Sequence, residues 1–267
     1  MSLFKRILGS ELVDLGICSD FPLINAVLLN LQEGKIFQDD SGSVFVCHKA
    51  GFSELLLSNG NANTLRHFLD FLISEKDVPQ YFHIYNATDK LAEACAGQTD
   101  NFNLKVRTRI QLVVDRGDPQ YSKHLPQSFY KSPINKSNIN YLDAFDLALG
   151  SKFWNSCTDF LESGFGNYVH EQSPDTPASI CYSACIANGV AEIDVATLPP
   201  YRQRGLAKIA VSGFMELCNN NHIRSNWDCF SDNIESIQTA RSLGFKTIKE
   251  YLFLSIFKNK KETKYEN

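Results

Sequence analysis

The segment from Ala191 to Leu217, AEIDVATLPPYRQRGLAKIAVSGFMEL, decides the fold of this 267-residue chain. A strand-like run, Ala191–Leu198, ends at two prolines, and a basic loop, Tyr201–Arg204, leads to Gly205. The apolar residues that follow recur at helical spacing: Leu206, Ile209, Ala210, Gly213, Phe214 and Leu217. Strand, basic glycine turn and helix in this order predict a pyrophosphate site, because free backbone N–H groups and the positive end of the helix dipole meet at the turn.

A hairpin is expected directly before this loop. Asn188-Gly189 separates two apolar runs, Ala178–Ala187 and Val190–Leu198, which is a strong signal for a type I′ turn. The pairs expected from this turn are Ala187 with Val190, Cys185 with Glu192, and Ser183 with Asp194. Glu192 and Asp194 would then share one sheet face with the small side chains of Cys181, Ser183 and Cys185. The two carboxylates are candidates for catalysis, and solvated carboxylates on a half-exposed face are the alternative.

The loop Arg202-Gln203-Arg204-Gly205-Leu206-Ala207 resembles the cofactor loop of the GNAT acyltransferase superfamily, which reads Arg/Gln-x-x-Gly-x-Gly/Ala. The resemblance extends over roughly Ser151–Phe257. It includes Glu192 in the preceding strand, a second strand at Ile223–Phe230, and the stretch DNIESIQTARSLGF, whose helix is expected to be capped by Asp232. Within the family, SNWDCF and YRQRGLA are similar to the branch that includes the zwittermicin A resistance acetyltransferase.

The resemblance implies an α/β (α+β) fold in which helices flank a mixed, mostly antiparallel sheet. It also implies acetyl-CoA as the cosubstrate, with its pyrophosphate on the amides of Arg204–Ala207 and with added charge from Arg202 and Arg204. Pantetheine would contact the backbone near Val195 and Thr197 and the side chain of Asn233. The predicted cofactor residues are therefore Val195, Thr197, Arg202, Gln203, Arg204, Gly205, Leu206, Ala207 and Asn233.

For catalysis, transfer to an amine requires removal of a proton from an ammonium group, and a carboxylate can accept it. Glu192 is the first candidate for this base, and Asp194 and Asp228 are further catalytic candidates. The tyrosine that serves many members of the superfamily as a general acid is replaced here by Ala240. Cys229, Tyr201 or water are the remaining sources of that proton. Trp227 is expected to pack its strand against the helix.

The function implied is acetyl-CoA-dependent N-acetylation of a small-molecule amine, with antibiotic-type acceptors among the candidates. Two alternatives stay open. One is a tandem GNAT-like protein that uses an acylated carrier or an aminoacyl donor, and the other is a non-catalytic module that binds acetyl-CoA. Either would leave the cofactor loop in place, so the loop alone does not separate them.

Three segments are expected along the chain. Residues 1–116 form an α/β unit that contains a period-two strand, Leu104–Val114, and lacks a basic cofactor turn, which makes it a candidate for a degenerate GNAT-like copy. Residues 117–137 contain three prolines among polar residues and are interpreted as a linker. Residues 138–267 are expected to form the acetyltransferase domain.

Composition narrows the class of protein. Hydrophobic residues make up 43% of the chain and charged residues 21%, which is typical of a globular protein with a full core. The net charge of −4 argues against a protein that coats nucleic acid. No apolar run reaches the length of a membrane span, the six histidines show no metal-ligand spacing, and the eight cysteines form no CxxC pair. We therefore expect reduced cysteines, no metal and no membrane partner in a cytoplasmic protein.

Overall fold

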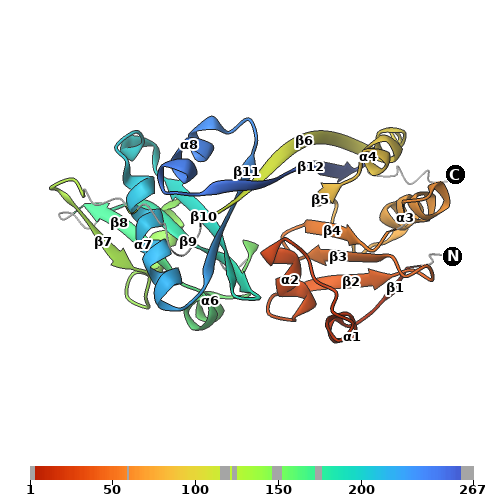
Figure 1. Ribbon diagram of the computed structural model, residues 1–267, viewed down its shortest axis with the longest axis horizontal. Coiled ribbons are helices and arrows are strands. Elements are labelled where there is room, and N and C mark those ends of the chain that lie inside the picture. Colours follow the sequence, from red (N-terminus) through yellow and green to blue (C-terminus); the bar gives the residue numbers. More distant parts are fainter. Residues whose placement is uncertain are drawn as a thin grey trace, which may run out of the picture. The chain divides into compact units, whose positions relative to one another are not determined.

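The protein is described by a computed structural model that covers residues 4–58, 60–114, 121, 125–145, 152–171 and 176–259. The chain divides into two compact units (Figure 1). The first comprises Met1–Ser19, Val27–Arg109 and Tyr251–Asn267, and the second comprises Asp20–Ala26 and Ile110–Glu250. Each unit contains a mixed, mostly antiparallel sheet with helices against it, so the expected fold class is confirmed.

The sheet of the first unit has the strand order β1-β2-β3-β4-β5-β12-β6. Its strands are β1 (Lys5–Arg6), β2 (Gly34–Gln38), β3 (Val44–His48), β4 (Phe52–Leu56), β5 (Tyr81–Ala87), part of β6 (Phe102–Val113) and part of β12 (Lys246–Lys258). Its helices are α1 (Gly9–Val13), α3 (Ala62–Ser74) and α4 (Asp89–Ala96), while α2 (Pro22–Leu28) has residues in both units. The core forms where apolar residues of α3 and α4, such as Phe68 and Leu91, meet inward residues of the strands, such as Phe82 and Leu254. The β6 strand forms where it was predicted, but the predicted alternation is wrong at two positions, because Val106 is exposed and Gln111 is buried.

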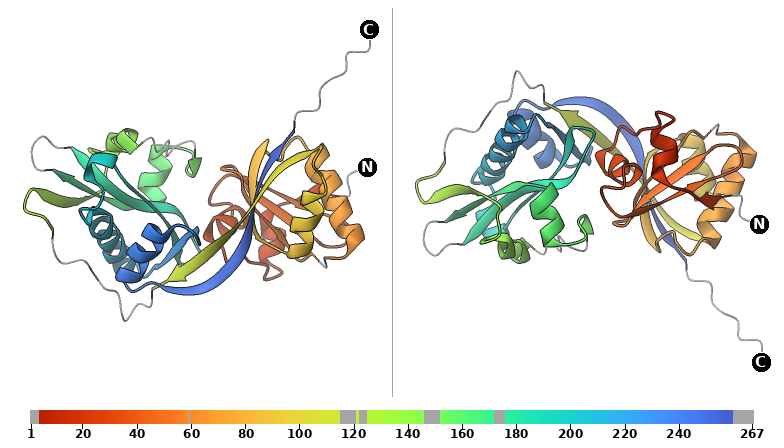
Figure 2. Two further views of the ribbon diagram at one scale, coloured as in Figure 1. Left: turned by 90° about the horizontal axis from the view of Figure 1, so that it is seen from above. Right: turned by 90° about the horizontal axis from the view of Figure 1, so that it is seen from below.

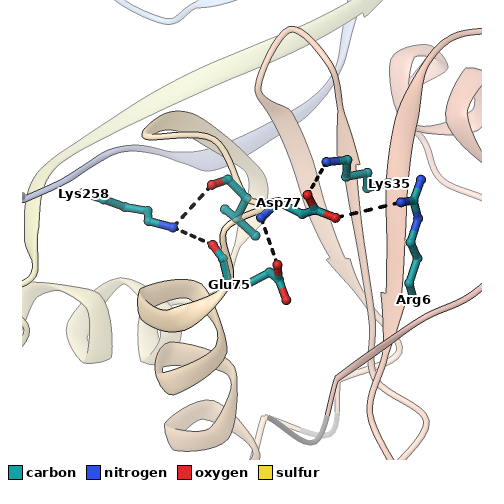
Figure 3. Close-up of polar contacts among 6 residues, drawn as sticks. Arg6, Lys35, Glu75, Asp77 and Lys258 are labelled. Carbon is teal, nitrogen blue, oxygen red and sulfur yellow. Dashed lines mark hydrogen bonds and ion pairs between the residues drawn. The ribbon is translucent and has the colours of Figure 1, made fainter.

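The C-terminal strand β12 closes this sheet and is fixed at its end by Lys258. Its backbone pairs antiparallel with β5, from Leu252 with Ala87 to Phe257 with Tyr81. Figure 3 shows the Lys258 Nζ atom, which donates to the carbonyl oxygens of Glu75 at 2.9 Å and Val78 at 3.3 Å. Burial lowers the pKa of Lys258. In the same view, Lys35 Nζ lies 2.7 Å from Asp77 Oδ1 in an ion pair. This contact is the largest cause that lowers the pKa of Asp77.

The sheet of the second unit has the order β6-β11-β10-β9-β8-β7. It contains β7 (Phe129–Pro133), β8 (Gly166–Glu171), β9 (Pro177–Ala187), β10 (Val190–Thr197) and β11 (Arg224–Phe230). The helical segments are a 3₁₀ helix at Ile139–Phe145, α6 (Cys157–Ser163), a 3₁₀ turn at Pro199–Tyr201, α7 (Leu206–Asn220) and α8 (Ile234–Ser242). Both views of Figure 2 show α7 along the strands of this sheet. Phe214 of α7 and Ala240 of α8 are fully buried in one core with Ala191 and Trp227 of the strands.

The register of the β9–β10 hairpin confirms part of the prediction. Asn188 and Gly189 have φ of 50° and 69°, as a type I′ turn requires, and Ala187 pairs with Val190 and Cys185 with Glu192. The predicted pair of Ser183 with Asp194 is wrong. A β-bulge after the Glu192 pair places Ser183 opposite Ile193 and Tyr182 opposite Asp194. As a result Cys181 pairs with Val195 and belongs to the core beneath α7, and Tyr182 takes the position opposite Asp194.

The predicted segment boundaries differ from the observed units in two ways. The second unit begins at Ile110 and ends at Glu250, so the end of the predicted third segment belongs to the first unit. The predicted linker contains β7, which pairs with β8; residues 115–120 and 122–124 lie outside the described residues.

The N-cap of α8 also differs from the prediction by one residue, because the side chain of Asn233, and not that of Asp232, accepts from the Ser236 amide at 3.1 Å.

Membrane, metal and disulfide features can be stated for the described residues. None of the helices in these ranges is long and apolar enough to cross a bilayer. The same ranges contain no group of three or more His, Cys, Asp or Glu side chains arranged to hold a metal ion. All eight cysteines are free thiols, and most of them are buried.

Candidate functional site

The basic loop is shaped by two residues in the left-handed backbone region. Pro199 and Pro200 end β10 and start a single 3₁₀ turn. Gln203 then has φ of 61° and Gly205 has φ of 76°. Gly205 is exposed, and a Cβ atom added to it would meet no heavy atom within 4 Å. The glycine is therefore required by the backbone conformation and not by a lack of space.

The helix that follows starts without a side-chain cap. Gly205 is the N-cap residue and has no side chain to accept from the first turn, and the first turn contains no acidic residue. The amides of Leu206, Ala207 and Lys208 precede the first intrahelical bond, which runs from the Ile209 amide to the Gly205 carbonyl at 3.4 Å. The helix end thus offers amide donors, the positive end of the dipole and the Lys208 side chain to an anion.

Strands β10 and β11 diverge next to this helix end. Their parallel register runs from Val190 with Arg224 to Glu192 with Asn226, and the paired rows end there. Beyond that row lies a hollow of about 850 Å³. Its lining comes from the end of β10, the basic loop, the start of α7 and α8: Val195, Ala196, Thr197, Tyr201, Arg202, Gln203, Gly205, Leu206, Ala207, Lys208, Asn233, Glu235, Gln238 and Thr239.

The structure brings nearly all the predicted cofactor residues to this hollow. Val195, Thr197, Arg202, Gln203, Gly205, Leu206, Ala207 and Asn233 line it. Arg204 is not among the lining residues, and its guanidinium carbon lies 5.6 Å from the centre of the Tyr201 ring. The Arg202 Nε atom donates to the Thr197 carbonyl at 3.2 Å, which ties the loop back to the end of β10.

Sequence reasoning missed the wall of the hollow that α8 provides. Glu235, Gln238 and Thr239 lie there with Asn233. Their spacing of three and four residues places them on one side of a helix, and this pattern was readable from the sequence. Polar residues at this spacing are equally typical of a solvated helix face, so the sequence alone does not distinguish the two.

Glu192 lies at the point where the two strands part. Its side chain is buried, with 8% of the residue exposed, and its Oε2 atom accepts from Asn226 Nδ2 at 2.5 Å. On the other side, Cys185 of β9 is its backbone pair. Burial, and next the charge of Glu192, raise the pKa of the Cys185 thiol well above its usual value, so that thiol stays neutral. Glu192 is therefore a buried carboxylate in the last paired row of β10 and β11, and it is not among the residues that line the hollow.

The other two predicted carboxylates occupy different settings. Asp194 Oδ2 accepts from the Tyr182 hydroxyl at 2.7 Å and forms an ion pair with Lys152 at 3.2 Å. Asp194 is thus held in a local network next to Glu192 along β10. Asp228 is half-buried on β11 and is not among the residues that line the hollow. Neighbouring Trp227 donates from Nε1 to Ser236 Oγ of α8 at 3.0 Å and packs edge-on against Phe245. Trp227 therefore packs its strand against the helix, as predicted.

The residues considered for thiolate protonation differ in access. Ala240 is fully buried and Cys229 is 6% exposed. Tyr201 lines the hollow, and its hydroxyl donates to Glu171 at 3.0 Å. That hydrogen bond is the first cause that raises the pKa of Tyr201. Of these side chains, only Tyr201 reaches the hollow.

A helix start in the first unit is built differently from the start of α7. Helix α3 is capped by the Asn61 side chain, which accepts from the Thr64 amide at 2.9 Å. A hollow of about 530 Å³ beside this helix start is lined by Asp39 and Asp40. A capped helix end next to two acidic residues disfavours an anion, in contrast to the start of α7.

Comparison with known proteins gives concordant matches. The model of a family described as GNAT acetyltransferase matches residues 20–254. The chain is 36% identical over 127 residues to a Bacillus subtilis (strain 168) protein named "uncharacterized N-acetyltransferase YdfB", and the match covers 48% of each chain. The chain thus spans about half the length of that curated relative.

Two solved structures show the same fold. A GCN5-related N-acetyltransferase-like protein of Streptococcus suis 89/1591 aligns with a TM-score of 0.70 at 18% identity, covering 93% of this chain and 98% of that one. A tandem GNAT protein from the clavulanic acid biosynthesis pathway aligns with a TM-score of 0.62 at 9% identity, covering 94% and 97%. At these identities the likeness concerns the fold alone.

Proposed function

The chain belongs to the GNAT acetyltransferase family, and from this premise we propose that it transfers the acetyl group of acetyl-CoA to an amine of a small molecule. The observation that carries the proposal is the hollow lined by the end of β10, the basic loop, the start of α7 and α8. The hollow contains the uncapped helix start, and the buried Glu192, which does not line it, precedes its first lining residue, Val195, on the same strand. A donor with an anionic pyrophosphate and a reactive thioester at opposite ends of one arm suits such a site.

The residues that line the hollow fit acetyl-CoA in their charge and in the hydrogen-bond donors that they offer. The amides of Leu206, Ala207 and Lys208 and the Lys208 side chain would hold the pyrophosphate. Arg202 would add charge from the loop, and Asn233 would contact the pantetheine arm from α8. Acetyl-CoA, when bound, supplies the thioester carbonyl and a thiol leaving group.

Glu192 would act as the general base. Its carboxylate would take a proton from the acceptor ammonium, so that the nitrogen lone pair becomes free to form the N–C bond. The C–S bond then breaks, a second nitrogen proton is lost, and the sulfur leaves as a thiol. The sum is ammonium plus thioester giving amide, thiol and one proton. Tyr201 or water would supply the proton to sulfur.

Glu192→Gln tests this assignment, because Gln keeps the size and hydrogen-bonding capacity of Glu but loses the basic oxygen. Turnover should fall by roughly two to four orders of magnitude, the usual worth of general-base catalysis. The acid limb of the pH–rate profile should disappear, while donor affinity measured by calorimetry stays close to that of the wild type. Near-normal turnover with the acid limb intact would remove Glu192 from the mechanism.

The acceptor is best sought without bias. Purified protein, labelled acetyl-CoA and a set of amines should be incubated together, and acetylated products read by mass spectrometry. Antibiotic-type amines are tested first in that set because SNWDCF and YRQRGLA resemble the zwittermicin A resistance branch. Donor binding without turnover on any amine would favour a non-catalytic module, and turnover only with an aminoacyl or carrier-bound donor would favour the tandem alternative.

A further inference from the structure

We infer that Asn226 is a positioning residue that holds Glu192 in its ionised form and fixes the direction of its carboxylate. The inference rests on the proposed role of Glu192 as the base. Asn226 Nδ2 donates to Glu192 Oε2 at 2.5 Å, and only 1% of Asn226 and 8% of Glu192 is exposed. The contact is therefore a hydrogen bond to a carboxylate within a buried setting.

The position of this pair in the sheet gives it a specific use. Glu192 and Asn226 form the last paired row of β10 and β11. The same two strands thus fix both backbones, while beyond this row the lining of the hollow begins at Val195. The strand fixes the backbone of Glu192, and the neighbouring amide fixes its carboxylate in one orientation. A general base needs such a fixed orientation to meet an acceptor that enters where β10 and β11 diverge.

An amide donor stabilises the charged form of a carboxylic acid over the neutral form. Two titratable groups lie close to Glu192 along β9 and β10. Cys185 faces Glu192 from β9 and stays neutral, and Asp194 lies two residues along β10 with Tyr182 and Lys152 as its own partners. The Asn226 amide is thus a contact that favours the ionised state of Glu192.

A simpler interpretation is that Asn226 only satisfies a buried polar group. The two interpretations differ in what removal of the amide changes. Loss of an amide that only satisfies a buried group with no part in catalysis lowers stability and leaves the acid limb of the pH–rate profile in place. Loss of a positioning contact shifts that limb, because one hydrogen bond to a charged group is worth about 1.5–3 kcal/mol, or about one to two pH units.

The experiment compares three single variants with the wild type. Asn226→Leu removes the donor, and Asn226→Asp keeps the shape but replaces the donor by a second carboxyl group. Ser225→Ala is the matched control, since Ser225 is a buried neighbour on β11 whose hydroxyl contacts Cys218 of α7. Folding is checked by circular dichroism, and kcat/KM is measured from pH 5 to about pH 10, with donor affinity measured by calorimetry.

The acid limb should move up by about one to two pH units in Asn226→Leu, with activity recovering at high pH. It should also move up in Asn226→Asp, where two carboxyl groups share one proton. The limb should stay in place in Ser225→Ala. An unmoved limb in a folded Asn226 variant overturns the inference.

A double-variant cycle separates this inference from the proposed function. If Asn226 acts through Glu192, adding Asn226→Leu to Glu192→Gln should change kcat/KM less than twofold. If the two losses multiply, Asn226 acts independently and the positioning role is wrong even though Glu192 remains the base. If Glu192→Gln keeps the acid limb, the proposed function of Glu192 fails and the positioning role fails with it.

Discussion

Gly205 allows the anion site to be tested with a charge change that leaves the fold in place. Its φ is 76°, and no heavy atom lies within 4 Å of an added Cβ. A substitution therefore causes no steric clash, and its penalty comes from the left-handed backbone, about 1–2 kcal/mol for an L-residue. Gly205→Gln should thus fold with this moderate loss in the free energy of unfolding.

The side chain introduced by Gly205→Glu has the same size as the one introduced by Gly205→Gln, and it adds one negative charge at the start of α7. Two like charges about 5 Å apart repel by about 3 kcal/mol at an effective dielectric constant of about 20. That energy corresponds to roughly a hundredfold loss of donor affinity. The difference between the Glu and Gln variants isolates charge from backbone strain.

Calorimetric titration of acetyl-CoA into both folded variants measures this difference, and a repeat at high salt should narrow it. CoA without the acetyl group should show the same gap, because the pyrophosphate is common to both. Equal donor affinities in the Glu and Gln variants would show that the start of α7 does not hold the anion.

Two further predictions concern stability. Phe214→Ala should lower the free energy of unfolding by about 3–5 kcal/mol, because the ring is fully buried beneath α7; denaturant unfolding measures this, and a loss below 1 kcal/mol would contradict the described core. Burial, and next the Lys49 charge, lower the pKa of His48 to about 3, so the folded state resists a proton that the unfolded state takes up near pH 6.5. Stability should therefore fall as pH drops from about 6.5 towards 3, by up to about 1.4 kcal/mol per pH unit, and His48→Gln should show a smaller slope in the same assay.

The features that the sequence predicted well depend on local chemistry. Asn188-Gly189 forms the expected turn because these two residues adopt positive φ more easily than others, and Gly205 adopts positive φ at the predicted loop. The helix after Gly205 follows from its apolar spacing. Each of these signals lies within a few neighbouring residues, so no tertiary information was needed.

The features that the sequence did not predict depend on partners far along the chain. The β-bulge that pairs Asp194 with Tyr182, and not with Ser183, is a property of two paired strands. The sequence of neither strand alone indicates it. The Glu192–Asn226 contact joins residues 34 positions apart, and it needed the parallel register of β10 and β11. The return of Tyr251 and the residues after it to the first unit has the same origin.

The closure of the first unit by β12 has a consequence for the order of events during synthesis. The sheet of this unit lacks one strand until Tyr251 and the residues after it have been made, and Arg109 is the last earlier residue of the unit. At about 5–20 residues per second the ribosome needs roughly 7–30 s to cover that interval. Until then β5 lacks the strand that pairs along one side of it, and Glu75 and Val78 lack the Lys258 ammonium group. The N-terminal half of this protein therefore completes its fold last, and premature termination near residue 250 should expose β5 to pairing with other chains.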